Sequence, residues 1–130
     1  MANMKVKHIL YVFVTIVFFT ACSPDQAVKK YYKACLKGDY DAASRQVIAV
    51  QREACATLGD YLGKAESESM HRRKVKVREV QVKPIDDTSS VASCTLIVQS
   101  GAQSDTTHKV VMLKKESGRW LICNGMLFSK

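Results

Sequence analysis

The chain has 130 residues, which gives room for one domain and excludes a multidomain architecture. Its formal net charge of +8 favours anionic partners over cationic ones. The sequence shows no internal repeat and no low-complexity tract, so neither a solenoid nor a long disordered region is expected.

Residues 1–21 are typical of a targeting segment that is not part of the fold. Lys5, Lys7 and His8 give a positive start, and residues 9–21 are uninterruptedly apolar or small. At about 1.5 Å per residue this apolar run extends about 20 Å, which is short of the roughly 30 Å of a bilayer core. The segment therefore predicts a secretory signal peptide rather than a membrane-spanning helix.

The predicted signal segment ends at a cysteine. Phe19, Thr20, Ala21 and Cys22 resemble the lipobox of bacterial lipoproteins, with Phe19 in place of the usual Leu. The resemblance implies cleavage between Ala21 and Cys22, a diacylglyceryl group on the Cys22 thiol and an acyl chain on the new amine. The alternative is a plain signal peptide with an incidental cysteine, although Phe19 is bulky for ordinary cleavage. Several acyl chains would hold residues 22–130 at a membrane almost permanently.

Ser23 follows the predicted lipidation site. By analogy with lipoprotein sorting, where Asp at this position retains proteins in the inner membrane, Ser23 favours the outer membrane, facing the periplasm. A first helix is predicted to begin at Pro24 with Ser23 as its N-cap, so almost no linker separates the domain from the anchor. The basic side chains of this helix form either a headgroup contact or a solvated face: Lys29, Lys30, Lys33 and Lys37.

A second helix is predicted to follow almost at once, because Gly38 suits a left-handed C-cap and Asp39 suits the next N-cap. Its apolar positions continue at helical spacing to the region of Gly63. The polar stretch Lys64–Ser69 is predicted to be a loop.

From Lys74 the hydrophobic period changes from helical to alternating, which predicts a first strand that Pro84 ends. The alternation slips by one residue at Arg78–Val80, as it would at a β-bulge. Three further strands are expected at Val91–Gln99, Thr107–Lys115 and Trp120–Asn124. Together these elements predict an α+β domain, with two N-terminal helices packed on one face of a curved, four-stranded antiparallel sheet.

Three segments carry a resemblance to a known family: PDQAVKKYY at 24–32, LKGDYDAA at 36–43 and LKKESGRWLI at 113–122. Their order and spacing resemble those of uncharacterised bacterial lipoproteins of the nuclear-transport-factor-2-like (NTF2-like, or cystatin-like) superfamily. The resemblance implies a cone-shaped domain over residues 22–130. The superfamily includes ketosteroid isomerases and dehydratases, but this lipoprotein branch has no assigned activity.

The enzymes of this superfamily place an acid, a His or a Tyr inside the cone. Among the acidic residues here, only Glu79 lies inside a predicted strand. An inward Glu79 would have a raised pKa and could act as a general base, but strand acids more often face water. His71 and His108 share no metal-ligand spacing, and neither a phosphate loop nor a nucleophile elbow is present. We therefore expect no catalytic residue, no metal and no cofactor.

A candidate pocket for an apolar or aromatic ligand would open between the helices and the sheet. Its members are Tyr31, Tyr32, Tyr40, Glu79 and Trp120. The alternative is that the aromatic members are ordinary core and rim residues.

A basic stripe is the candidate patch for an anionic partner, although a solvated strand face explains the alternating part equally well. Its members are Arg72, Arg73, Lys74, Lys76 and Arg78. No aromatic residues are interleaved among these charges, so nucleic-acid binding is not expected.

Four cysteines remain beside Cys22: Cys35, Cys55, Cys94 and Cys123. A straight second helix would carry Cys55 about 24 Å from the helix start, too far from Cys35 for a bridge. The predicted hairpins place Cys94 opposite Met112, one strand away from Cys123. We expect buried free thiols, while a helix-to-sheet bridge stays open, and a kinked helix or a slipped register would restore the neighbour pairs.

The leading hypothesis is a membrane-anchored, non-catalytic module of the cell envelope that binds a protein, glycan or lipid partner. The second is a small-ligand-binding or isomerase-like domain that uses the cone. The third is a structural subunit of an envelope complex. A cavity of about 300 Å³ or more with an inward ionisable group would favour the second.

Overall fold

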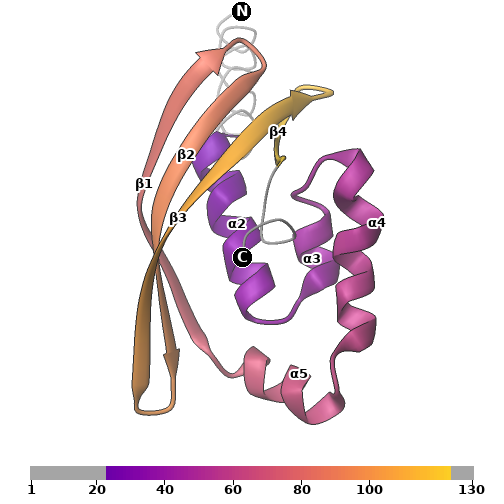
Figure 1. Cartoon of the computed structure of the whole chain (residues 1–130), viewed down its shortest axis with the longest axis vertical. Helices are drawn as coiled ribbons and strands as arrows, with labels where there is room; N and C mark the ends of the chain where they lie inside the picture. Colours follow the sequence, from indigo (N-terminus) through magenta and orange to yellow (C-terminus); the bar gives the residue numbers. More distant parts are fainter. Residues whose placement is uncertain (1–22, 124–130) are drawn as a thin grey trace, which may run out of the picture.

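The computed structural model describes residues 23–123, and it confirms the predicted α+β fold class (Figure 1). The predicted signal peptide, Cys22 and the cleavage site at Ala21 lie outside the described residues. The helical elements are α2 (Pro24–Leu36), α3 (Tyr40–Ser44), α4 (Ala49–Thr57), the 3-10 helix η1 (Leu58–Tyr61) and α5 (Lys64–His71). The strands are β1 (Lys74–Asp86), β2 (Ser89–Ser100), β3 (Gln103–Glu116) and β4 (Arg119–Ile122).

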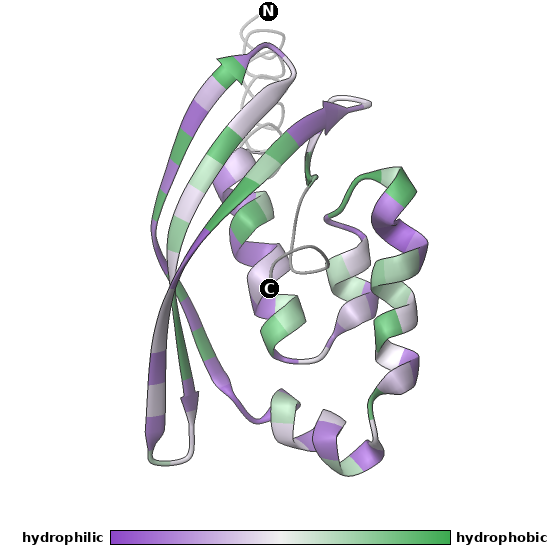
Figure 2. Cartoon of the chain, viewed as in Figure 1, coloured by the Kyte–Doolittle hydropathy of each residue, from purple (hydrophilic) through white to green (hydrophobic). Residues whose placement is uncertain are grey.

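The four strands form one antiparallel sheet in the order β1-β2-β3-β4. The predicted bulge in β1 is confirmed, because the pairing with β2 shifts between Arg78 and Gln81, and Glu79 has a positive φ of 55°. Apolar and polar residues alternate along β1, as Figure 2 shows, so one side of the strand faces the helices and the other faces away.

Two predicted strand ends are wrong. Pro84 does not end β1 but pairs with Ser90, which is allowed because β1 is an edge strand and needs no N–H donor on its open side. The loop predicted at Ser100–Asp105 is a tight turn, with Ser100 already paired to Gln103. Gly101 makes this turn feasible through its φ of 61°.

The hydrophobic core lies between α2 and the inner face of the sheet. Val28, Tyr31 and Tyr32 of α2 are almost completely buried, and so are Leu113 of β3 and Ile122 of β4. The rings of Tyr31 and Tyr32 pack edge to face with their centroids 5.2 Å apart. Within residues 23–123, no helix is both long enough and apolar enough to cross a membrane.

The predicted second helix is wrong as a single element, because α3, α4 and η1 replace it. Between α3 and α4 the chain becomes extended, and Val47 forms a parallel bridge with Ile122. The Ile48 N–H donates to the Ile122 carbonyl at 3.0 Å, and the Ile122 N–H donates to the Gln46 carbonyl at 2.7 Å. These bonds, together with burial of Val47 and Ile48, replace the helical bonds that the break removes.

The loop predicted at Lys64–Ser69 is instead part of α5. This helix has no buried residue, so it lacks the apolar stripe by which a helix is recognised in a sequence. Met70 of α5 packs closely against Gly38, where an added Cβ would lie 3.3 Å from the Met70 Cβ. Gly38 is therefore required both by its φ of 79° and by the approach of α5.

The positions of the cysteines differ from those predicted. Cys94 pairs with Lys109, and Met112 pairs with Val91, so the predicted register is wrong because the β2–β3 turn is shorter than expected. Cys35, Cys55, Cys94 and Cys123 are all free thiols, the first three buried. The broken helix removes the straight-line distance that separated Cys35 from Cys55, and both belong to one core cluster.

Candidate functional site

The structure places the four aromatic members of the candidate pocket in or against one core cluster, and Glu79 outside it. Tyr31 and Tyr32 are each 1% exposed, so they fill the space between α2 and the sheet instead of lining a hollow. Trp120 is half-buried at the sheet rim, with the Lys115 Nζ 5.9 Å from its ring centroid. Tyr40 is half-buried at the start of α3. The aromatic members are thus core and rim residues.

Glu79 lies on the opposite side of the sheet, which we call the outer face, because it points away from the helices. Thr95 has its neighbours Cys94 and Leu96 in the core, so its own side chain points to the outer face. The Thr95 Oγ1 donates to the Glu79 Oε2 at 3.1 Å, which fixes the carboxylate on that face. The option of an inward general base is therefore wrong, because the bulge turns Glu79 away from the core.

His108 is the third member of the polar cluster formed with Glu79 and Thr95. Its Nδ1 lies 3.1 Å from the same Thr95 hydroxyl. A threonine hydroxyl has a single proton, so when it donates to Glu79 the second bond requires Nδ1–H of His108 as the donor. The order along the outer face is then His108, Thr95 and Glu79, with the imidazole Nε2 left as the acceptor.

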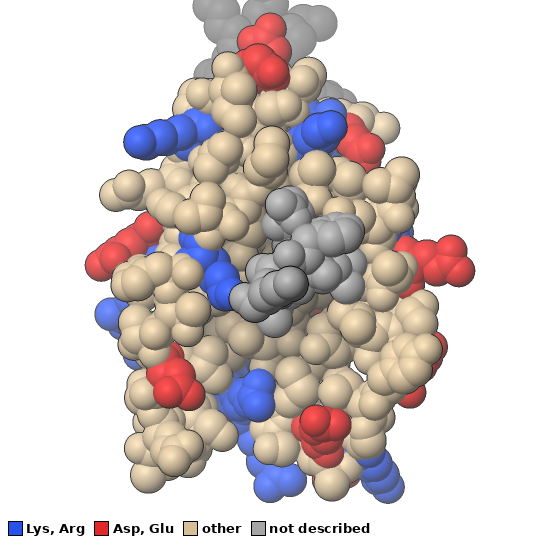
Figure 3. Space-filling model, viewed as in Figure 1, with Lys and Arg blue, Asp and Glu red and all other residues tan. Residues whose placement is uncertain are grey.

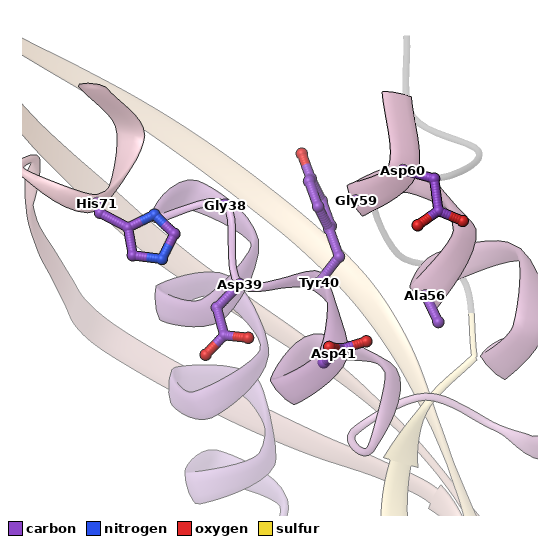
Figure 4. A pocket seen from close by; sticks show the side chains of 8 residues that line it. All are labelled: Gly38, Asp39, Tyr40, Asp41, Ala56, Gly59, Asp60 and His71. Atoms are coloured by element: carbon purple, nitrogen blue, oxygen red, sulfur yellow. The ribbon is translucent and has the colours of Figure 1, made fainter. Parts of the chain in front are cut away.

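An open pocket of about 320 Å³ lies where α3, η1 and α5 meet (Figure 4). Asp39 lines this pocket and caps α3 by accepting from the Ala42 N–H at 3.2 Å. The Tyr40 ring, the Asp60 carboxylate and the His71 imidazole are contributed by three different elements. The remaining lining residues are Gly38, Asp41, Ala56 and Gly59.

The polar groups of this pocket are a phenol, an imidazole and carboxylates. Burial raises the pKa of the Tyr40 hydroxyl, with smaller contributions from Cys35 and Cys55, so it is a neutral donor at physiological pH. The His71 Nδ1 is 2.7 Å from the Ser67 carbonyl and donates to it, which leaves Nε2 as the accepting nitrogen. The lining contains carboxylates, a phenol and an imidazole but no Ser, Thr or Cys nucleophile. Within residues 23–123, no group of three or more His, Cys, Asp or Glu side chains is arranged to hold a metal ion.

The predicted basic stripe divides into two parts. The Arg73 Nη1 donates to the Leu36 carbonyl at 3.4 Å, and Arg72 lies 3.9 Å from Glu68, so both turn toward the helices. The alternating members of the stripe lie on the outer face instead: Lys74, Lys76 and Arg78.

Two further basic residues share the outer face and were missed by the sequence argument. Lys83 follows the inward Val82, and Lys114 follows the buried Leu113, so strand alternation directs both outward. Alternation alone could have placed them, but only the strand pairing shows that they flank the same surface. On the face drawn in Figure 3, by contrast, basic and acidic residues are intermixed.

Comparison with known proteins identifies the fold. No protein-family model matches the chain, and no match is found among curated proteins. Among solved structures, an NTF2-like protein of unknown function from Shewanella oneidensis is similar, with a TM-score of 0.55, 17% identity, and coverage of 75% of this chain and 88% of that one. A SEC-C motif containing protein from Rhodopseudomonas palustris has a TM-score of 0.53 and 16% identity, covering 79% of this chain and 77% of that one.

An NTF2-like protein from Campylobacter jejuni, named as a candidate transpeptidase, has a TM-score of 0.50 at 14% identity. The similarity covers 78% of this chain and 97% of that one. At these identities the likeness concerns the fold alone. The chain therefore has the NTF2-like fold that the sequence motifs suggested.

Proposed function

We propose that the protein is a membrane-anchored, non-catalytic binding module of the bacterial cell envelope. Its mature chain begins at Cys22, which carries the lipid anchor, and it needs no cofactor. Its partner is a protein or a glycan near the membrane. Ser23 favours the outer membrane, with the domain facing the periplasm.

One observation carries this proposal: α2 begins at Pro24, directly after the lipobox-like sequence that ends at Cys22. Asp25 stands in the first turn, where the helix dipole favours an acid, so the helix has a well-defined start with no linker before it. A domain that begins next to its acyl chains is held against the lipid surface. The packing of Tyr31 and Tyr32 supports a non-catalytic role, because these side chains fill the part of the cone where the superfamily's enzymes bind substrates.

Metabolic labelling with an alkyne fatty acid tests the anchor. The wild-type protein and a Cys123→Ser control are expected to incorporate the label, whereas Cys22→Ser is expected to lose it and to keep residues 1–21. Equal labelling of Cys22→Ser and wild type, or an unlabelled wild-type protein, would contradict the proposal.

A second candidate function is supported by the open pocket beside Tyr40. Its volume of about 320 Å³ suits a small ligand, and its carboxylates favour a polar or cationic one. The site differs from the cone that the superfamily's enzymes use. Equilibrium dialysis of the protein against a panel of small polyamines and amino sugars tests this candidate, with Asp60→Asn expected to weaken binding and Asp105→Asn expected to leave it unchanged.

A further inference from the structure

The outer face of the sheet combines basic and apolar side chains. The pairing of β1 with β2 places Lys83 beside Val91 and Lys76 beside Ile97, and the pairing of β2 with β3 adds Met112 beside Val91. Residues paired across strands share a face, so these side chains form one surface. The basic members of the outer face are Lys74, Lys76, Arg78, Lys83 and Lys114. The apolar members are Val91, Ile97, Val110 and Met112.

The apolar members are exposed to solvent. Val110 is 69% exposed and Met112 is 38% exposed, while Val91 and Ile97 are half-buried. Val111, the neighbour of Val110 on β3, is 3% exposed because it belongs to the core on the inner face. The helices cover only the inner face, so within residues 23–123 no element covers this apolar surface (Figure 1). An exposed apolar surface bordered by charges is typical of an interaction site.

The charge of this surface is net basic, because five basic residues outnumber its two acidic ones. Glu79 is one acidic member, and its carboxylate is bonded to Thr95. Asp86, the last residue of β1, pairs with Ser89, whose partner on β3 is Lys114, so it is a second acidic residue of this face, and its Oδ1 accepts from the Thr88 N–H at 2.8 Å. Asp105 is not part of this surface, because it pairs with Val98 and lies on the inner face of the sheet. The outer face therefore attracts anions.

The apolar part of the outer face also lies toward the end of the domain that meets the proposed anchor. The β1–β2 turn and the start of α2 are at the same end of the molecule (Figure 1). The row Lys83, Val91 and Met112 is close to that turn, because Ser89 begins β2. A domain tethered at its N-terminus brings this end to the lipid surface first.

We propose that the outer face of the sheet docks on an anionic lipid surface. Val91, Val110 and Met112 enter the interface, while Lys83 and Lys114 contact headgroup phosphates on either side. Apolar insertion and electrostatic attraction act together in such binding, and an acidic peptide or glycan would use only the cations. This inference rests on the proposed membrane attachment for its biological setting, but the lipid contact itself needs no acyl chain.

Vesicle sedimentation tests the docking. The core cluster around Tyr31 and Leu113 contains no acyl chain, so the mature chain can be made as residues 22–130 with Cys22→Ser. At low salt, we expect at least tenfold more binding to vesicles of equal phosphatidylglycerol and phosphatidylcholine than to phosphatidylcholine alone. Because this protein carries no lipid, its result is independent of fatty-acid labelling, and either proposal can fail without the other.

Two paired variants assign the binding to the outer face. Lys83→Glu with Lys114→Glu is expected to reduce binding at least tenfold, and Val110→Ser with Met112→Ser at least threefold. The matched control on α2, Lys30→Glu with Lys33→Glu, changes the same charge on another exposed surface and is expected to alter binding less than twofold. Far-UV circular dichroism checks that each variant is folded.

Three results would overturn the inference. One is no preference for anionic vesicles at low salt. Another is an equal loss of binding in the α2 control. The third is self-association, measured by sedimentation velocity, that Val110→Ser with Met112→Ser removes, because a second copy would then cover the outer face.

Discussion

The pKa of the Cys35 thiol is raised from 9.0 to about 12, mainly by burial, while a hydrogen bond with Tyr31 opposes the rise and the nearby Cys55 adds a smaller part of it. The folded pKa exceeds the unfolded one, so the neutral thiol stabilises the fold below pH 9, and this contribution is lost as the pH rises from 9 toward 12. We predict that Cys35→Ala flattens the fall of the unfolding free energy over this range. Urea unfolding at several pH values measures it, with Cys123→Ala as the control. An unchanged slope in Cys35→Ala would show that Cys35 does not contribute.

Glu79 has a φ of 55°, a left-handed backbone conformation that is unfavourable for residues other than glycine. We predict that Glu79→Gly is more stable than Glu79→Ala by about 1 kcal/mol, because both variants lose the bond to Thr95 but only glycine is unstrained. At Lys76, in ordinary strand backbone, the order is expected to reverse. Thermal unfolding of the four variants gives the comparison, and the same order at both positions would contradict the bulge geometry.

At the scale of the elements, β3 provides a direct test of which face of the sheet is covered. Val111 is 3% exposed and Val110 is 69% exposed, although they are neighbours of the same type. We predict that Val111→Ala lowers the unfolding free energy by about 2 kcal/mol, from lost burial and a new cavity, while Val110→Ala changes it by less than about 0.5 kcal/mol. Chemical denaturation measures both. Similar losses would mean that β3 is covered on both faces.

Local patterns predicted the sheet and its bulge, because strand alternation around Val77 and its slip at Glu79 are properties of neighbouring residues. The break at Val47 was not predictable in the same way, since it depends on a backbone pairing with Ile122 at the far end of the chain. The α5 helix was missed because it has no apolar stripe. The predicted pocket between the helices and the sheet was wrong, because Tyr31 and Tyr32 fill that space, and how tightly they pack there depends on the tertiary structure.

At the scale of the whole molecule, the proposed anchor and the outer face would act together to hold the domain on the membrane. The acyl chains of Cys22 would attach the domain at its N-terminal end, and the basic, partly apolar sheet face would hold it in a fixed orientation on the lipid. The open pocket beside Tyr40 lies on the helical side of the domain and would stay accessible to a partner.

The intact mass of the protein extracted from native membranes tests the central claim most directly. We expect a chain that begins at Cys22 and carries a diacylglyceryl group and an amide-linked acyl chain. A mass that includes residues 1–21, or a mature chain with an unmodified Cys22, would contradict it.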